Sequence, residues 1–165
     1  MRRADPGVRG SPAMTPKIEA LFNDALIAAA ARTPRGPTPT HADFHVHRDN
    51  PFCGDEVSID LVLGEDGRIA TATVRARGCL LVEAAATVLA EAAPGLHPCD
   101  IAEAARHLRA MLKKNTPPPG APWATLEMFS AISSTPSRHS CALLPFEAVE
   151  KALGGPLVQS SLCKK

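Results

Sequence analysis

Two alternating segments joined by a turn decide the fold class of this chain: Val-Ser-Ile-Asp-Leu-Val-Leu at residues 57–63 and Ala-Thr-Ala-Thr-Val-Arg-Ala at residues 70–76. Apolar side chains recur at every second position, which is the pattern of a half-buried strand. Gly-Glu-Asp-Gly at 64–67 predicts a hairpin connection between the two. Residues 42–47 alternate in the same way, with Phe44 and Val46 on the apolar side. Three consecutive strands, each with one apolar face, predict an antiparallel sheet that must be covered.

The sequence also predicts helices that can cover one face of this sheet. Residues 80–92 are rich in Ala and contain no Gly or Pro, and apolar residues recur at helical spacing over 18–32. An Asp-x-x-Glu capping box predicts a helix over 100–112. Residues 123–132 form a short helical stripe, and 145–153 predict a last helix that ends at Gly154-Gly155. The predicted fold class is therefore α+β, a three-stranded antiparallel sheet covered on one face by several helices.

Length and composition restrict the possible functions. The 165 residues carry a net charge of +1 and no basic stripe, which argues against nucleic acid as a partner. We expect a disordered leader over 1–14, one domain over 15–155 and a flexible tail over 156–165. The first residues lack the hydrophobic core of a secretory signal, and no apolar segment is long enough to cross a membrane. We therefore expect a cytoplasmic protein whose five cysteines bind metal, react or are buried, and are not disulfide-bonded.

Three cysteines lie at junctions between predicted elements. Cys53 lies in a turn that enters a strand, Cys79 stands before the Ala-rich helix, and Cys141 stands before the last helix. A helix N-terminus lowers the pKa of a thiol, which makes it a better ligand and nucleophile. Three thiolates and the Asp55 carboxylate fit a tetrahedral zinc site or one side of an iron–sulfur cluster. The spacing by itself leaves buried structural cysteines as an alternative.

The segments around these cysteines resemble a known family. Asn-Pro-Phe-Cys-Gly-Asp at 50–55 is similar to the N-P-x-C-G-D motif of the U-type iron–sulfur cluster assembly scaffolds, the NifU N-terminal and IscU-like proteins. Gly78-Cys79 and Cys141 follow in the family's order, and Arg-Thr-Pro-Arg at 32–35 resembles its turn after the first helix. The long gap between the second and third cysteines and the segment 126–138 favour the Suf-type branch, the SufU proteins.

The resemblance implies a function and a set of site residues. Cys53, Asp55, Cys79 and Cys141 would bind metal, and the three cysteines would hold zinc or a 2Fe-2S or 4Fe-4S cluster. Cys141 and Cys53 are the candidates for accepting persulfide sulfur. The implied partners are a cysteine desulfurase, of the Suf type, and apo iron–sulfur proteins or carriers. The chain would thus bind a metal or nascent cluster and accept sulfur for cluster assembly.

The sequence also departs from the family near the site. Leu80 and Leu81 follow Cys79 where small polar residues are usual, and Ser140 stands where the family has His or Lys. His139 therefore inherits no ligand role, although in an extended segment it would face the same way as Cys141. Arg138 is a candidate for steering an anionic partner or a persulfide.

Three other functions stay open at this stage. One is a zinc-dependent sulfurtransferase without a scaffold role, and another is a structural zinc module. The third is a thiol hydrolase, for which His139 is the candidate base.

Two histidines and the other two cysteines are not expected to take part in the function. His45 and His47 form an H-x-H pair, which we interpret as part of a solvated strand face. We expect Cys99 to be structural and Cys163 to be exposed without a role.

Overall fold

The computed structural model describes residues 23–34, 37–51 and 53–153. The expected leader over 1–14, the tail over 156–165 with Cys163, and the first part of the helix predicted over 18–32 therefore lie outside the described residues.

The sheet is the expected antiparallel meander. Its strands are β1 (Phe44–Asn50), β2 (Asp55–Leu63) and β3 (Ile69–Arg77), in the spatial order β1-β2-β3. Val46 pairs with Ile59, which pairs with Val74, so apolar side chains form rows across one face. β1 continues three residues past its predicted end, because Asp49 and Asn50 pair with the start of β2. This extension places the turn that carries Cys53 at the end of the sheet.

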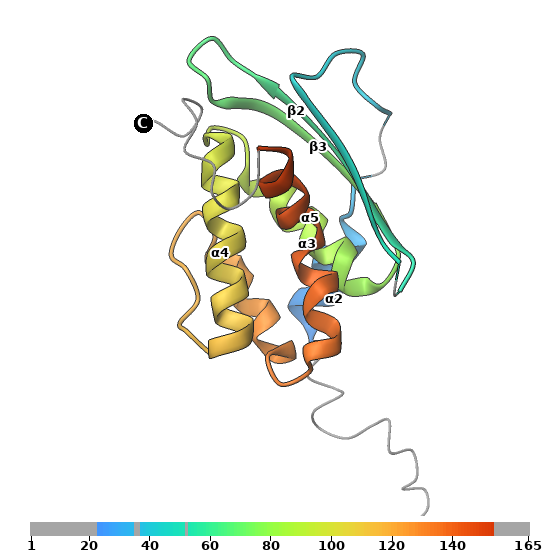
Figure 1. Ribbon diagram of the computed structural model, residues 1–165, viewed down its shortest axis with the longest axis vertical. Helices are drawn as coiled ribbons and strands as arrows, with labels where there is room; N and C mark the ends of the chain where they lie inside the picture. Colours follow the sequence, from blue (N-terminus) through green and yellow to red (C-terminus); the bar gives the residue numbers. More distant parts are fainter. Residues whose placement is uncertain (1–22, 35–36, 52, 154–165) are drawn as a thin grey trace, which may run out of the picture.

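The helices all lie on one side of that sheet, as Figure 1 shows. They are the α-helices α2 (Asp24–Ala31), α3 (Leu80–Ala92), α4 (Pro98–Lys114) and α5 (His139–Ala152), and the 3₁₀ helices η3 (Ala124–Ile132) and η4 (Pro136–Arg138). α3 and α5 pack directly on the strands, α2 packs on α3, and α4 packs on α5. The α+β prediction is confirmed, with the helices forming more than one layer.

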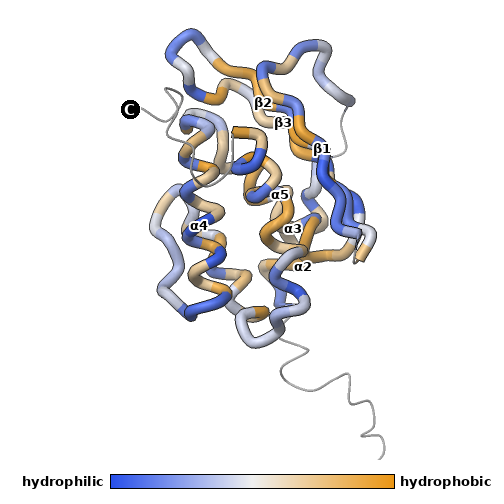
Figure 2. The backbone as a smooth tube through the Cα atoms, in the orientation of Figure 1, coloured by the Kyte–Doolittle hydropathy of each residue, from blue (hydrophilic) through white to orange (hydrophobic). Residues whose placement is uncertain are grey.

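The core lies between the sheet and the two inner helices. Figure 2 shows that α3 is largely hydrophobic, whereas α4 alternates between polar and apolar positions. Eight residues of α3 are buried, most of them alanine or valine. Small side chains let this helix approach the strands closely, so a chain with only 4% aromatic residues still forms a dense core.

Two helix starts differ from the prediction. α4 begins at Pro98, with His97 as N-cap, and Asp100 is its third residue, accepting a hydrogen bond from the His97 N–H at 2.9 Å. α5 begins at His139, six residues before the Pro145 predicted to open it, so Cys141 lies within the first turn. Pro145 removes one backbone hydrogen bond but lies inside the helix. Burial of residues 141–146 outweighs that loss.

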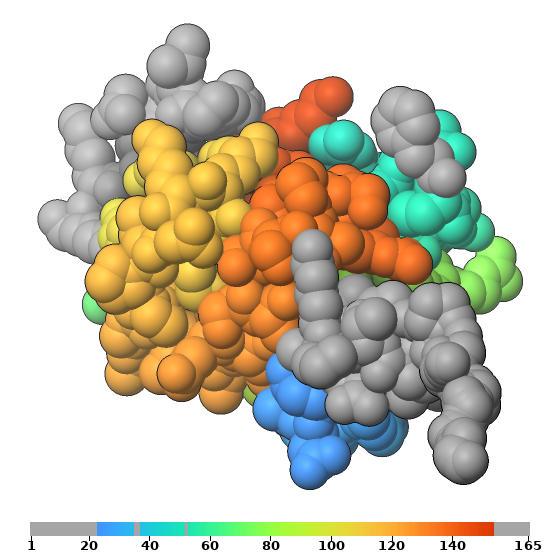
Figure 3. Space-filling model, turned by 90° about the horizontal axis from the view of Figure 1, so that it is seen from below, coloured from blue at the N-terminus to red at the C-terminus, as the bar shows by residue number. Residues whose placement is uncertain are grey.

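The helix predicted over 123–132 is a 3₁₀ helix, with Leu126, Phe129 and Ile132 buried. In the view from below, the orange η3–η4 segment lies beside the yellow α4 (Figure 3). Among the described residues, no helix has the length and apolar character needed to span a membrane.

Candidate metal centre

The turn between β1 and β2 sets the position of Cys53. The backbone carbonyl of Asn50 accepts hydrogen bonds from the N–H of Cys53 at 3.2 Å and of Gly54 at 2.8 Å. Gly54 has φ +73°, a left-handed conformation that favours glycine. The Asn50 amide donates to Ser140 Oγ at 2.9 Å. The turn is thus attached to the start of α5, and Cys53 is exposed above it.

Asp55, the first residue of β2, lies beneath this turn with 1% of its surface exposed. Its Oδ1 accepts a hydrogen bond from the Cys79 N–H at 3.0 Å, and its Oδ2 accepts from the Cys79 thiol at 3.3 Å. Cys79 is the N-cap of α3. The carboxylate therefore joins the start of β2 to the start of α3.

Gly78 makes this approach of strand and helix possible. A Cβ at this position would lie 2.7 Å from Asp55 Cγ and 3.0 Å from Asp55 Cα, and the backbone has φ +150°. Such contacts are far inside van der Waals separation. Any other residue at position 78 would push the carboxylate away.

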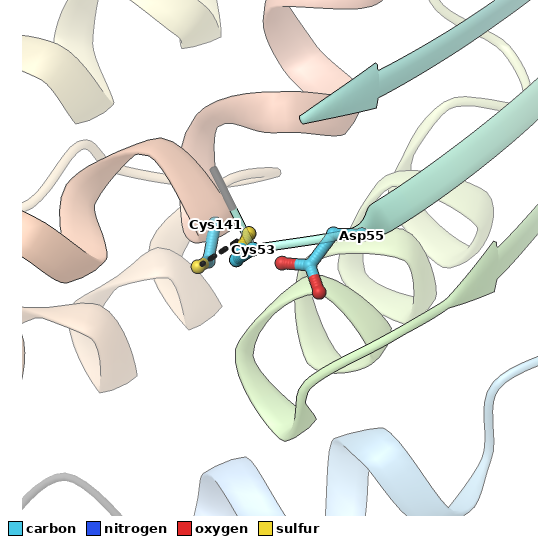
Figure 4. Close-up of side chains that lie close together, drawn as sticks. All are labelled: Cys53, Asp55 and Cys141. Carbon is cyan, nitrogen blue, oxygen red and sulfur yellow. Dashed lines mark hydrogen bonds between the residues drawn. The ribbon is translucent and has the colours of Figure 1, made fainter. Parts of the chain in front are cut away.

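Cys141 completes the cluster from the opposite side. It is the third residue of α5, and 1% of its surface is exposed. Its Sγ lies 3.8 Å from Cys53 Sγ, and Figure 4 shows both sulfurs beside the Asp55 carboxylate. One ligand atom from each of Cys53, Asp55 and Cys141 lies within 4.8 Å of the others. The structure thus brings the four candidate residues into one cluster, with Cys79 attached through Asp55.

The thiols and the carboxylate shift one another's pKa values. Burial raises the pKa of Asp55, but hydrogen bonds from the Cys53 thiol, the Cys79 N–H and the Cys141 and Cys79 thiols outweigh it, so the pKa falls below its usual range. The Cys141 pKa is raised, first by its hydrogen bond to Cys79 and then by burial. The Cys79 pKa is lowered, chiefly by that same bond. Burial and the Asp55 carboxylate raise the Cys53 pKa.

The described residues of this cluster are one carboxylate and three thiols. None of the groups that stabilise the Asp55 carboxylate among the described residues is a cationic side chain. A buried carboxylate beside three thiols is a donor set for a thiophilic divalent cation. Bound metal would favour the thiolate forms, because ligand thiols bind deprotonated.

Other candidate residues lie outside this cluster. His139 is buried, and its Nε2 lies 2.9 Å from the carbonyl oxygen of Ile132 and 3.2 Å from that of Ser133. Its segment is helical, so the extended arrangement that would align it with Cys141 is wrong. Arg138 is exposed at the end of η4.

His45 and His47 lie on the outer sheet face. His45 lies 2.5 Å from Asp60 and His47 lies 2.9 Å from Ser58, which fits the interpretation as a polar strand face.

Cys99 is disulfide-bonded, contrary to the expectation for the five cysteines, whereas Cys53, Cys79 and Cys141 are free.

The sequence does not predict the structural roles of Asn50, Ser140 and Gly78 in holding the site together. Asn50 and Gly78 belong to the motifs at 50–55 and 78–79, which is the only sequence signal for them. The Asn50–Ser140 contact joins residues 90 positions apart, and no local pattern predicts it.

No protein-family model matches the sequence, and no curated protein matches it either. Solved structures share the fold. One is the N-terminal part of a nitrogen-fixing NifU-like protein from Brucella abortus, with a TM-score of 0.78 and 22% identity, covering 87% of this chain and 99% of the other. Another is a protein described as an iron–sulfur cluster assembly scaffold of the SUF system from Fervidobacterium islandicum, with a TM-score of 0.71 and 18% identity, covering 79% and 95%. The fold implied by the motif resemblance is confirmed.

Proposed function

We propose that this chain is a U-type iron–sulfur cluster assembly protein of the Suf-type branch. It binds a metal or nascent cluster and accepts sulfur from a cysteine desulfurase. Three observations support the proposal: the N-P-x-C-G-D motif at 50–55, the shared fold, and the cluster of Cys53, Asp55 and Cys141 with Cys79 bonded to Asp55.

One observation carries the proposal. Asp55 is an almost fully buried carboxylate whose pKa is lowered by thiols and a backbone N–H, without a cationic side chain among the described residues. These neutral donors favour the charged carboxylate, so Asp55 offers an oxygen ligand without needing a cationic side chain. A metal ion held by Asp55 and the three thiolates would use that negative charge.

The four residues would have different roles, set by their solvent exposure and their ligand atoms. Cys53 is the exposed thiol, so it is the first candidate for accepting sulfur from a partner, and the neighbouring Cys141 is the second. Cys79 and Cys141 would hold metal at the N-termini of α3 and α5, where the helix dipoles favour negative charge. Asp55 would be the exchangeable ligand, since a carboxylate binds a thiophilic metal less tightly than a thiolate does.

The proposed partners follow from this chemistry. A cysteine desulfurase would supply the sulfur, and apo iron–sulfur proteins or carriers would receive the finished cluster. The proposed location is the cytoplasm, where free thiols remain reduced. The resident metal would be zinc, or a 2Fe-2S or 4Fe-4S cluster carried as cargo.

The other functions considered fit the geometry less well. A structural zinc site is closed, whereas this one includes an exposed thiol and a carboxylate. A thiol hydrolase needs a base, and His139 is instead bonded to backbone carbonyls. A zinc-dependent sulfurtransferase without a scaffold role would use the same residues and differs only in the cargo.

The test is cluster assembly by the anaerobically purified protein, in the wild type and in Cys53→Ser, Cys79→Ser and Cys141→Ser. We expect metal in the wild type and, with ferrous iron, cysteine and a desulfurase, a visible spectrum of an iron–sulfur cluster that passes to an apo acceptor. Each variant should lose both. Sulfur uptake without a cluster would favour the sulfurtransferase, and unchanged metal content in the variants would exclude the shared site.

A further inference from the structure

We infer that Cys141 is the resolving thiol of this site: it displaces sulfide from a persulfide formed on Cys53 and leaves a Cys53–Cys141 disulfide. The inference rests on the proposed sulfur-accepting function and deepens it. It states how sulfur that arrives in the sulfane form is released as sulfide, the form that an iron–sulfur cluster contains.

The distance between the two sulfurs supports this role. Cys141 Sγ lies 3.8 Å from Cys53 Sγ, which is close to van der Waals contact. A disulfide requires about 2.05 Å between the sulfurs, so the two atoms must approach each other further for the bond to form. The Asn50–Ser140 hydrogen bond holds the two backbones together, because Ser140 precedes Cys141 and Asn50 begins the turn of Cys53.

The exposure of the two thiols assigns them different tasks. Cys53 is exposed and accessible to an external sulfur donor, whereas Cys141 has 1% of its surface exposed and can be reached only from within the site. After transfer, the inner sulfur of the persulfide is Cys53 Sγ, the atom already facing Cys141 (Figure 4). The added outer sulfur is the leaving group.

The step balances without an external reductant. The Cys141 sulfur attacks Cys53 Sγ, a bond forms between these two sulfurs, and the bond from Cys53 Sγ to the outer sulfur breaks. The outer sulfur leaves with the bonding electron pair as hydrosulfide, and the proton of the Cys141 thiol goes to it. The outer sulfur is reduced to sulfide, and the Cys141 thiol is oxidised to a disulfide sulfur. A dithiol reductant must then reopen the disulfide before another cycle.

Cys79 is the matched comparison within the site. Cys79 is also a free thiol, and its sulfur lies 3.3 Å from the Asp55 carboxylate. The ligand atoms of Cys53, Asp55 and Cys141 all lie within 4.8 Å of one another, and Cys79 does not belong to that group. The geometry therefore assigns the resolving role to Cys141 and a metal-holding role to Cys79.

The experiment uses metal-free full-length protein under anaerobic conditions, without reductant, and one equivalent of glutathione persulfide as the probe. Released sulfide is trapped and measured, and the sites of sulfur addition and disulfide formation are mapped by peptide mass spectrometry. We expect about one sulfide per chain and a Cys53–Cys141 disulfide in the wild type. In Cys141→Ser and Cys141→Ala the persulfide should stay on Cys53, with sulfide release at least tenfold lower.

Two results would overturn the inference in different ways. A persulfide that persists on Cys53 of the wild type, or that moves intact to Cys141 without sulfide release, excludes resolution by Cys141 and leaves the proposed function in place. Absence of sulfur on Cys53 in both the wild type and Cys141→Ser excludes the sulfur-accepting function itself. The disulfide mapped in the wild type needs no variant, so a folding defect at the buried position 141 does not affect that result.

Discussion

Asp55 differs from the other ligand candidates at the scale of single residues, because it is the sole oxygen donor among them. Its carboxylate is held by the N–H and the thiol of Cys79 and lies beneath the Cys53 turn. A site that exchanges its cargo needs one ligand weaker than the rest. In the proposed site the carboxylate would be displaced first, and the three thiolates would keep hold of the metal.

Asp55→Ala should therefore slow exchange without abolishing binding. We expect the variant to retain metal or cluster longer than the wild type in the presence of a chelator. It should also transfer the cluster, and take up desulfurase-derived sulfur, more slowly. Metal retention and sulfur uptake are measured side by side. Asp60→Asn is the control, because Asp60 is a buried carboxylate of the same strand on the opposite sheet face. If Asp55→Ala matches the wild type in both assays, Asp55 is only a turn residue.

Gly78 has no side chain, and this leaves the space that the Asp55 carboxylate occupies. In Gly78→Ala the new Cβ would overlap Asp55, so we expect loss of metal binding as well as loss of stability. Gly95→Ala is the matched control, since Gly95 has φ +91° and no atom within 4 Å of an added Cβ. Left-handed strain alone should cost the control roughly 1–2 kcal/mol in the free energy of unfolding. Metal titration and urea denaturation together test this: equal metal affinity in the two variants would contradict the role given to Gly78.

At the scale of elements, the site depends on how the β1–β2 turn meets α5. The turn carries Cys53, the helix carries Cys141, and the Asn50 side chain bonds the turn to Ser140. Because α5 starts at His139 and not at Pro145, Cys141 lies in the first turn of the helix. Elements far apart in sequence thus fix the distance between the two sulfurs.

Asn50→Ala should loosen that junction. Loss of the hydrogen bond to Ser140 is expected to lower the free energy of unfolding by about 1 kcal/mol and to weaken metal affinity. Ser140→Ala should show the same direction, and Ser137→Ala, at an exposed position of η4, should behave as the wild type. Urea denaturation and competition with a metal indicator provide the readouts. Unchanged affinity in both Asn50→Ala and Ser140→Ala would show that the turn holds its position without this contact.

The outer face of the sheet carries a separate polar network. Asp60 is 2% exposed and accepts hydrogen bonds from Arg75 at 2.9 Å and from His45. Burial raises the pKa of Asp60, but the bonds from His45 and Arg75 outweigh it, so the pKa lies below its usual value. This network joins the three strands at a distance from the thiols.

A lowered carboxylate pKa sets the sign of the pH dependence. The stabilisation is complete above the unfolded-state pKa of about 3.9 and is lost as the pH falls through the lower folded-state pKa. We expect Asp60→Asn to be less stable than the wild type by roughly 1.5–3 kcal/mol at pH 7, with a smaller difference in acid. Urea denaturation between pH 7 and pH 2 measures it. A difference that stays constant over this range would contradict the ion-pair explanation.

For the molecule as a whole, the metal candidates come from four separate places: the β1–β2 turn, the start of β2, the start of α3 and the start of α5. A metal bound there would connect the sheet to both inner helices. Because the unfolded chain does not hold these residues together, binding adds to the stability of the fold.

Chelation should consequently lower the Tm of the wild type. At a thousandfold excess of metal over its Kd the gain is about 4 kcal/mol, and removing the metal should reverse it. A variant with Ser at positions 53, 79 and 141 should show hardly any chelator effect. The measurement is thermal unfolding with and without chelator for both proteins. Equal shifts in the two would mean that the cysteines do not hold a stabilising metal.

The sequence by itself determined the local elements of this protein. Period-two alternation around the Gly64–Gly67 turn specified the β2–β3 hairpin, and the Ala-rich segment gave α3 with its bounds, 80–92. These patterns depend on neighbouring residues, so they can be read locally. The motif around Cys53 and its family resemblance supplied the candidate site before any distance was known.

Only the tertiary structure decided how those elements meet. The extension of β1 depends on pairing with β2, and the early start of α5 depends on burial of residues 141–146, which outweighs the hydrogen bond lost at Pro145. The 3.8 Å between the sulfurs of Cys53 and Cys141 and the fit of Gly78 over Asp55 join residues 88 and 23 positions apart. Such contacts arise from packing between segments, and no local pattern encodes them.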